Sequence, residues 1–341
     1  MSKSIIVSLK ALTVSLLACS PVFGADITFS PLFQEVSQYE TVLTTNSDRL
    51  DIYYPTAASE ADNLPSALFL QGALVDKADY SDFARTVASY GFVVVVPNHF
   101  QTAPGIDTPG LFPEVSQIDA AIDYLETENS NSTSPLNGIL DTDSLSLLGH
   151  SQGGAVGLSA IGNYCIPFLC NETNFTLPEE VKSGIFYGAF LREFEGEFLP
   201  IDNQQIPLGL ISGSRDGVAT PEEIRTSYEL IQNAPNALIT VEGANHYSIT
   251  NEDNLRDPLR PTLEQDIANE TIALWTSLFL RASVLGDETA ADFIYNSGDV
   301  LDDNVTVISK NKSKSVPESS NNLIFLALGI VSILLTSKSK M

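Results

Sequence analysis

The stretch Gly149-His150-Ser151-Gln152-Gly153 lies between an apolar run, Ser144 to Leu148, and a run rich in small residues, Gly154 to Gly162. A serine held in a sharp strand-to-helix turn adopts strained backbone angles, and its neighbours must approach other backbone closely. Glycine two positions before and two positions after the serine permits that approach. The stretch therefore predicts a nucleophile elbow, with Ser151 as the attacking group of a serine hydrolase.

The residues around this elbow also suggest where a developing negative charge would be stabilised. A helix that starts at the elbow points free N–H groups at the reaction centre, so the N–H of Gln152 is one candidate oxyanion donor. A second donor is expected from the loop after an early strand, where Leu70-Gln71-Gly72-Ala73 stands, and the N–H of Ala73 is the candidate. An ordinary strand-to-helix turn with a helpful glycine is the alternative for this loop.

Strand-like and helix-like segments alternate through the middle of the chain. The expected strands are 50–54, 67–71, 92–96, 144–148, 185–187, 208–212 and 238–241, and the expected helices are 80–90, 115–125, 154–162, 221–231 and 263–281. This order predicts an α/β fold, in which helices cover both faces of a mostly parallel central sheet. Reactive groups in such folds gather at the carboxyl ends of the strands.

Two polar side chains follow expected strands at that edge of the sheet. Gly213-Ser214-Arg215-Asp216-Gly217 comes after one strand, and Gly243-Ala244-Asn245-His246-Tyr247 comes after the next. Because the chain order is Ser, Asp, His, we expect Asp216 and His246 to complete a catalytic triad with Ser151. His246 would act as general base, and Asp216 would orient its ring and stabilise the imidazolium. A plain Asp-Gly turn is the alternative for Asp216.

The chain has only three histidines, which narrows the choice of general base. His150 is part of the elbow and is expected to point away from the path of the reaction. His99 follows the Val-rich strand, after Pro97 and Asn98, where a polar residue commonly ties a loop together. We therefore expect His246 to be the base, with His99 as the alternative.

The first residues are expected to form an export signal. Lys3 and Lys10 flank the start of an apolar segment that runs to Leu17, and residues 1–24 then end in Val22-Phe23-Gly24. This order predicts a signal peptide over 1–24 that is cleaved after Gly24. A lipoprotein cleavage box, Leu16-Leu17-Ala18-Cys19, is the alternative, and Cys19 would then become the acylated first residue.

Residues 309–341 are expected to form a linker and a hydrophobic tail. Val316-Pro317-Glu318-Ser319-Ser320 precedes an apolar run of 13 residues, Leu323 to Leu335, and a basic end. This run is short for a transmembrane helix, which needs about 20 residues. The order resembles the PEP-CTERM sorting signal, although Ser319 stands where that family usually has a second proline. The resemblance implies processing by an exosortase, and a permanent membrane anchor is the alternative.

The remaining region, 25–308, is expected to be a catalytic domain outside the cytoplasm. The whole chain has 17 Lys+Arg and 43 Asp+Glu, and seven of those basic residues and one acidic residue lie in 1–24 and 309–341. The region 25–308 therefore keeps 10 basic and 42 acidic residues, a net charge of −32. Such a surface repels nucleic acid and anionic lipid, so neither is an expected partner. The acidity fits a solvated, exported surface.

The cysteines also indicate an oxidising compartment. Cys19 leaves with the signal peptide unless the lipoprotein alternative holds. Cys165 and Cys170 are close enough to form a disulfide that pins the segment after the nucleophile helix. We prefer this interpretation to metal binding, because no further Cys or His lies near them at ligand spacing.

Several of these segments together resemble a known superfamily. They are Gln71-Gly72, Tyr80 to Pro97, Gly149 to Gly154, Ser214-Arg215-Asp216 and Asn245-His246. Over about Asp51 to Arg281 the chain resembles the α/β-hydrolase superfamily. It is most similar to the branch of dienelactone hydrolases, chlorophyllase-like proteins, polyester hydrolases and platelet-activating-factor acetylhydrolases. The resemblance implies ester hydrolysis through an acyl-enzyme on Ser151, with no metal or organic cofactor.

The departures from those relatives limit what can be said about the substrate. Chlorophyllases usually have Arg where Gln152 stands, and dienelactone hydrolases proper use Cys where Ser151 stands, so neither substrate carries over. No large lid fits between the strands 185–187 and 208–212, and Phe168 with Phe175 would form one apolar wall. An open, partly aromatic cleft suits modest acyl esters or an exposed polymer. A thioesterase, an acyltransferase or an inert surface protein on the same fold are the alternatives.

Overall fold

The computed structural model describes residues 29–43, 45–102, 108–171, 175–193 and 196–311. The predicted signal peptide and the predicted tail beyond residue 311 lie outside the described residues. The chain divides into two compact units, Met1–Ser30 and Pro31–Met341, and every helix and strand named below belongs to the second. Among the described residues, no helix is both long and apolar enough to span a bilayer.

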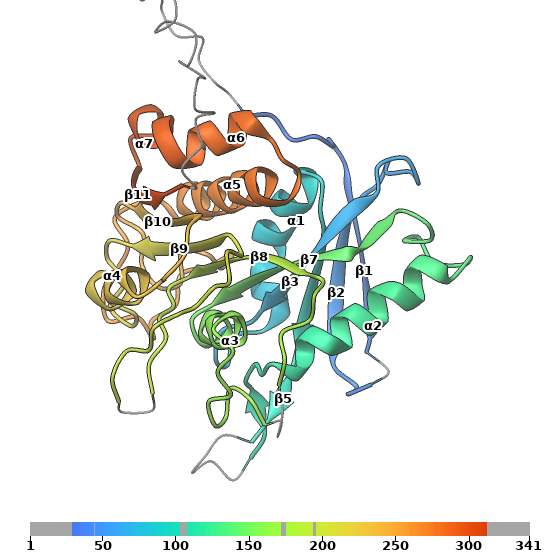
Figure 1. Cartoon of the computed structure of the whole chain (residues 1–341), viewed down its shortest axis with the longest axis horizontal. Helices are drawn as coiled ribbons and strands as arrows, with labels where there is room; N and C mark the ends of the chain where they lie inside the picture. The colour runs from blue at the N-terminus through green and yellow to red at the C-terminus, as the bar shows by residue number, and fades with distance from the viewer. Residues whose placement is uncertain (1–28, 44, 103–107, 172–174, 194–195, 312–341) are drawn as a thin grey trace, which may run out of the picture. The chain divides into compact units, whose positions relative to one another are not determined.

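A mixed sheet organises this unit (Figure 1). Its strands are β1 (Val36–Val42), β2 (Arg49–Pro55), β3 (Leu64–Leu70), β4 (Val93–Asn98), β7 (Leu140–His150), β8 (Val181–Tyr187), β9 (Leu208–Gly213), β10 (Asn236–Val241) and β11 (Val305–Lys310). Within the described residues their order is β1-β2-β4-β3-β7-β8-β9-β10-β11. All neighbours from β4 to β10 pair in parallel. The predicted α/β fold with a mostly parallel sheet is therefore confirmed.

The two edges of the sheet are antiparallel and were not predicted. At one edge β1 pairs with β2, and β2 pairs with β4. At the other edge β11 pairs with β10 and ends at Lys310, two residues beyond the predicted end of the domain at Ile308. Residues along both outer strands are partly exposed, and β11 alternates buried or half-buried with exposed positions. Polar residues break the apolar runs that mark the central strands, which explains why both were missed.

Helices lie on both faces of the sheet (Figure 1). They are α1 (Ser81–Ser89), α2 (Ser116–Ser130), α3 (Gln152–Ile161), α4 (Pro221–Glu229), α5 (Gln265–Val284), α6 (Glu288–Asp292) and α7 (Gly298–Leu301), with a 3-10 turn η1 (Lys77–Tyr80), a π-helical turn η2 (Phe293–Ser297) and a small hairpin, β5 (Phe100–Gln101) and β6 (Gly110–Leu111). α1 packs against α5 on one face, and α3 contacts β7 and β8 on the other. Each predicted helix overlaps an observed one.

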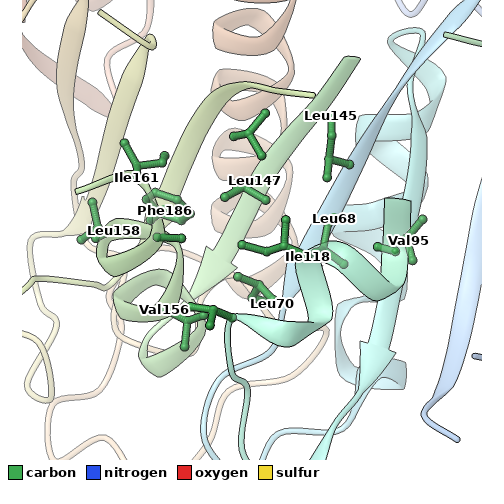
Figure 2. Packing of buried hydrophobic residues seen from close by; sticks show 14 of the residues in the cluster. Leu68, Leu70, Val95, Ile118, Leu145, Leu147, Val156, Leu158, Ile161 and Phe186 are labelled. Carbon is green, nitrogen blue, oxygen red and sulfur yellow. The ribbon is translucent and has the colours of Figure 1, made fainter. Parts of the chain in front are cut away.

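The core between the sheet and α2 and α3 is built from buried apolar side chains. Every residue of β3 and β4 is buried, as expected for strands covered on both faces. Figure 2 shows Leu68, Leu147 and Val95 from the sheet packed toward Ile118 of α2 and Val156 of α3. This packing holds the strand ends of the central sheet in a rigid frame, and the candidate site is built on those ends.

Two glycines allow α3 to lie unusually close to the sheet. A Cβ at Gly153 would stand 2.1 Å from the carbonyl oxygen of Leu70, and one at Gly157 would stand 2.2 Å from the ring of Phe186. Any side chain there would push the helix away from β3 or β8. The small-residue run after the elbow therefore sets the distance between α3 and the sheet. The segment after α3 is closed by a disulfide between Cys165 and Cys170.

Candidate active site

Ser151 lies between β7 and α3 with a strained backbone. Its φ is 54° and its ψ is −119°, a combination that is costly for a residue with a side chain. Its N–H donates to the carbonyl of Tyr187 at 2.9 Å, and its own carbonyl accepts from the N–H of Ala155 at 3.0 Å. These bonds to β8 and to α3 hold the turn, which presents the partly exposed serine at the carboxyl end of β7.

Asp216 and His246 form a buried pair. Asp216 follows β9, His246 follows β10, and Nδ1 of His246 lies 2.7 Å from Oδ2 of Asp216. The two residues are 1% and 2% exposed, so water does not compete for this contact. Since the carboxylate accepts, Nδ1 carries the proton and Nε2 is the nitrogen that remains to accept a proton from a serine hydroxyl.

The other oxygen of Asp216 is also held. Oδ1 accepts from the backbone N–H groups of Val218 at 2.9 Å and Ala219 at 2.8 Å. A carboxylate held by these backbone donors and by the imidazole keeps one orientation. Asp216 is therefore more than the turn residue that its Asp-Gly sequence allows, because its side chain joins the turn to the imidazole.

The imidazole of His246 lies beside the elbow. Its ring centroid is 4.7 Å from that of His150, the residue directly before Ser151. Across the described part of the chain, the Ser151 hydroxyl makes no hydrogen bond to His246. Such catalytic hydrogen bonds often tighten only when substrate is bound.

Both candidate oxyanion donors are free of protein acceptors within the residues that the structure describes. Gln152 is the first residue of α3, where an N–H has no partner within the helix. The Ala73 N–H lies in a loop whose next residue, Leu74, has a φ of 58°. The guanidinium of Arg256, an exposed side chain, donates to the carbonyls of Ala73 at 2.9 Å and Leu74 at 3.3 Å. This guanidinium joins the oxyanion loop to the loop that carries His246.

Asp257 is a site residue that sequence reasoning missed. Its Oδ2 accepts from the N–H of His246 at 2.8 Å and its Oδ1 accepts from the N–H of Leu259 at 2.7 Å, while the residue is only 1% exposed. Asp257 therefore fixes the backbone of the candidate base. It stands in a polar loop with no strand or glycine pattern around it, so nothing in the sequence marks it as a site residue. Only its burial in the folded structure identifies it.

His99, the alternative base, is bound at both ring nitrogens. Nδ1 lies 2.8 Å from Oδ2 of Asp48, and Nε2 lies 3.5 Å from Oε1 of Glu114. Burial opposes ionisation of the ring, but the hydrogen bonds to both carboxylates outweigh it and raise the pKa of His99 to about 9. The bond with His99 in turn lowers the pKa of Glu114 to about 2. A cation with two partners is a structural tie and a poor general base.

Replacement of His99 by Gln should change how stability depends on pH. The folded pKa is raised above the usual 6.5 to about 9, so the contribution of the ring is complete below about pH 6.5 and is lost as pH rises through about 9. Wild type should lose roughly 3 kcal/mol of unfolding free energy across that window relative to His99→Gln. Urea unfolding of both proteins across the window measures this difference. Parallel curves would contradict the assignment of a charged, paired His99.

Gly188 leaves room for the Asp216 and His246 pair. It has a φ of +60°, and a Cβ there would stand 3.0 Å from Nδ1 of His246 and 3.1 Å from Oδ2 of Asp216. Gly188→Ala should displace the imidazole by a few tenths of an ångström and lower kcat roughly 10- to 100-fold in an ester assay. Gly286→Ala is the matched control, because Gly286 has a φ of +65° with nothing within 4 Å. Equal kcat in the two variants would contradict the steric argument.

Among the described residues, no group of three His, Cys, Asp or Glu side chains is arranged to hold a metal ion. The candidate groups at this site are a hydroxyl, an imidazole, a carboxylate and backbone N–H donors. Such a set performs acyl transfer through a covalent serine intermediate.

Two comparisons with known proteins bear on this site. A family model described as PET hydrolase-like (PETase) matches residues 36–165, which include Ala73, Ser151 and Gln152. Chlorophyllase type 0 from Chenopodium album is 33% identical over 102 residues, which are 28% of this chain and 28% of the relative. The match thus spans less than a third of the curated relative.

The family-model match ends at residue 165, before Asp216 and His246, but the strand order covers these residues too. Strands β4 and β7 lie on opposite sides of β3, so the order of the sheet reverses there, and ligands of such sheets bind at that point. The elbow ends β7, and Asp216 and His246 follow β9 and β10 at the same edge. This topology is consistent with the α/β-hydrolase fold, and the chain resembles PET hydrolase-like proteins and a chlorophyllase over the matched residues.

Proposed function

We propose that this protein hydrolyses carboxylic esters through an acyl-enzyme on Ser151. The observation that carries the proposal is the 2.7 Å contact between His246 and Asp216 beside a serine with elbow geometry. The resemblance to PET hydrolase-like proteins and to a chlorophyllase supports an ester as the substrate class.

In the proposed reaction His246 moves a proton twice. Nε2 of His246 takes the proton of the Ser151 hydroxyl while Oγ attacks the acyl carbon, and Asp216 stabilises the resulting imidazolium. The N–H groups of Ala73 and Gln152 would bind the oxygen that becomes negative. The imidazolium then protonates the departing alcohol. A water molecule, deprotonated by His246, attacks the acyl carbon. The bond to Oγ of Ser151 then breaks, the imidazolium returns its proton to Oγ, and the acid is released.

Exposed apolar side chains near the site support an apolar ester as the substrate. Leu74 of the oxyanion loop is 55% exposed, and Leu255 of the loop after His246 is 89% exposed. Arg256 bonds the carbonyl of Leu74, so these two loops are neighbours. Phe168 packs edge-on against Phe112 with ring centroids 5.3 Å apart. This setting supports esters of modest size or an exposed polymer chain, as expected from the sequence.

A panel of nitrophenyl esters from acetyl to palmitoyl, with a soluble polyester oligomer, tests the proposal. Purified protein should hydrolyse the short esters, and a fluorophosphonate probe should label Ser151, as a mass shift on its peptide shows. Product analysis with an added alcohol separates hydrolysis from acyl transfer. Failure of both labelling and turnover would overturn the proposal, and hydrolysis of long-chain esters alone would overturn the expected preference for esters of modest size.

We also propose that the protein is exported and that its C-terminal tail resembles a PEP-CTERM address. The disulfide between Cys165 and Cys170 supports an oxidising compartment. The mass of the mature protein from its native envelope tests both ends at once. Intact residues 1–24, or an uncut tail, would overturn the corresponding part.

A further inference from the structure

Two buried side chains outside the predicted triad connect its parts. The N–H of Gly72 donates to the hydroxyl of Tyr80 at 2.9 Å, and that hydroxyl lies 3.0 Å from Nδ1 of His150. Nε2 of His150 lies 2.9 Å from the backbone carbonyl of His246. Gly72 precedes Ala73, and His150 precedes Ser151. One chain of hydrogen bonds thus links the oxyanion loop, the elbow and the candidate base.

The donor and acceptor chemistry of these groups assigns the position of each proton in this series of hydrogen bonds. The carbonyl of His246 can only accept, so Nε2 of His150 must carry a proton and donate it. Nδ1 of neutral His150 is then an acceptor, and the Tyr80 hydroxyl donates to it. The hydroxyl keeps a lone pair for the N–H of Gly72. Each donor has one acceptor, and for a neutral His150 no other arrangement satisfies all three contacts.

The surroundings keep both side chains neutral. Tyr80 and His150 are both 0% exposed. Burial lowers the pKa of His150 well below its usual value, and the nearby His246 lowers it further. Burial likewise raises the pKa of Tyr80 well above its usual value. In such surroundings hydrogen bonds are strong, and an unpaired polar group is costly.

The space around Gly72 confirms that the contact is tight. A Cβ at Gly72 would stand 2.7 Å from Nδ1 of His150 and 3.2 Å from the Tyr80 hydroxyl. The ring of Tyr80 is itself fixed by Phe69, with centroids 4.4 Å apart. The loop therefore rests directly on the imidazole of His150, and a movement of that ring moves the loop.

We infer that Tyr80 and His150 are positioning residues, which align the Ala73 N–H and the imidazole of His246 around the Ser151 hydroxyl. This inference rests on the proposed function. The Tyr80 hydroxyl fixes the position of the oxyanion loop, because it accepts a hydrogen bond from the N–H of Gly72. His150 fixes the backbone of His246 by a hydrogen bond to its carbonyl, and Asp257 fixes the same backbone by accepting from the N–H of His246. Neither residue is asked to touch the substrate.

Tyr80→Phe tests the first link, and Tyr53→Phe is its matched control. Both hydroxyls are buried, but among the described residues the Tyr53 hydroxyl has no hydrogen-bond partner, so its loss should leave the site unchanged. Tyr80→Phe should lower kcat roughly 10- to 100-fold with KM within about twofold, because misalignment of catalytic groups affects the transition state most. Tyr53→Phe should keep the wild-type kcat. Equal kcat in the two variants at equal melting temperature would overturn the inference.

His150 variants test the second link. His150→Gln keeps an N–H that reaches the carbonyl of His246, whereas His150→Ala removes it. The Gln variant should therefore retain more activity than the Ala variant. Equal activity in the two variants would contradict the proposed role of the hydrogen bond between His150 and the carbonyl of His246.

Nitrogen NMR of the histidine rings separates this inference from the proposed function. In wild type, His150 should be neutral with its proton on Nε2. Tyr80→Phe should shift the amide signals of Gly72 and Ala73 together with the ring signals of His246, even in a protein that hydrolyses no ester. A proton on Nδ1, or shifts confined to Gly72, would overturn the inference whatever the outcome of the ester assays.

Discussion

Ser151→Ala is expected to reduce ester hydrolysis by at least about a thousandfold while the protein stays folded. The hydroxyl is the proposed nucleophile, and no other side chain stands at the elbow to replace it. The backbone at Ser151 has a φ of 54°, which Ala tolerates no better than Ser, so the unfolding free energy should change little. Turnover of a short nitrophenyl ester and urea unfolding measure the two quantities.

Ser151→Gly sharpens this prediction. Glycine accepts a positive φ without strain, so this variant should be equally inactive and more stable than Ser151→Ala by about 1 kcal/mol. Ser66→Ala is the control, because Ser66 is 2% exposed and its hydroxyl has no hydrogen-bond partner in the part of the chain that the structure describes. Residual activity of Ser151→Ala within tenfold of this control would exclude the acyl-enzyme on Ser151.

Asp216→Asn is expected to lower kcat by roughly a thousandfold to ten-thousandfold. The Asn carbonyl can keep the bonds from the N–H groups of Val218 and Ala219, which Oδ1 of Asp216 accepts now. Its NH₂ then faces His246 Nδ1 and donates to it. The ring must move its proton to Nε2, where it can no longer accept the proton of the serine. The fold should remain intact, since the turn keeps its hydrogen bonds.

A double variant checks that Asp216 acts through the same unit. Ser151→Ala combined with Asp216→Asn should lose no more activity than Ser151→Ala alone, because the groups act together. Multiplied losses would show that Asp216 works independently of Ser151. If Asp216→Asn lowered kcat by less than tenfold, the Asp216 carboxylate would serve only to hold the turn.

Local sequence pattern was sufficient for the centre of the fold. β3, β4 and the second half of β7 are buried under helices on both faces, and each appears in the sequence as a largely apolar run. The edge strands β1 and β11 have an exposed side and carry polar residues such as Gln38 and Thr306, so no run marks them. Their pairing with β2 and β10 depends on neighbours distant in the chain.

The candidate site divides in the same way. The elbow glycines and the polar residues after each strand are local signals, and they led to Ser151, Asp216 and His246. The roles of Tyr80 and Asp257 are not readable in this way. Both act through backbone groups of other segments, the N–H of Gly72 and the N–H of His246. A backbone group is present at every residue, so the sequence carries no mark of which one is bound.

The sequence alone determined the order of elements, the serine in its strained turn and the short set of polar residues at the strand ends, because these follow from spacing within a few residues. Only the tertiary structure shows how His99 and His246 differ. Both follow strands at the same edge, but His99 meets Asp48 and Glu114 at its two nitrogens, whereas His246 meets Asp216 at Nδ1, as the proposed base requires. The physical reason is that the role of an imidazole depends on which carboxylates folding brings to it, and those lie far away along the chain.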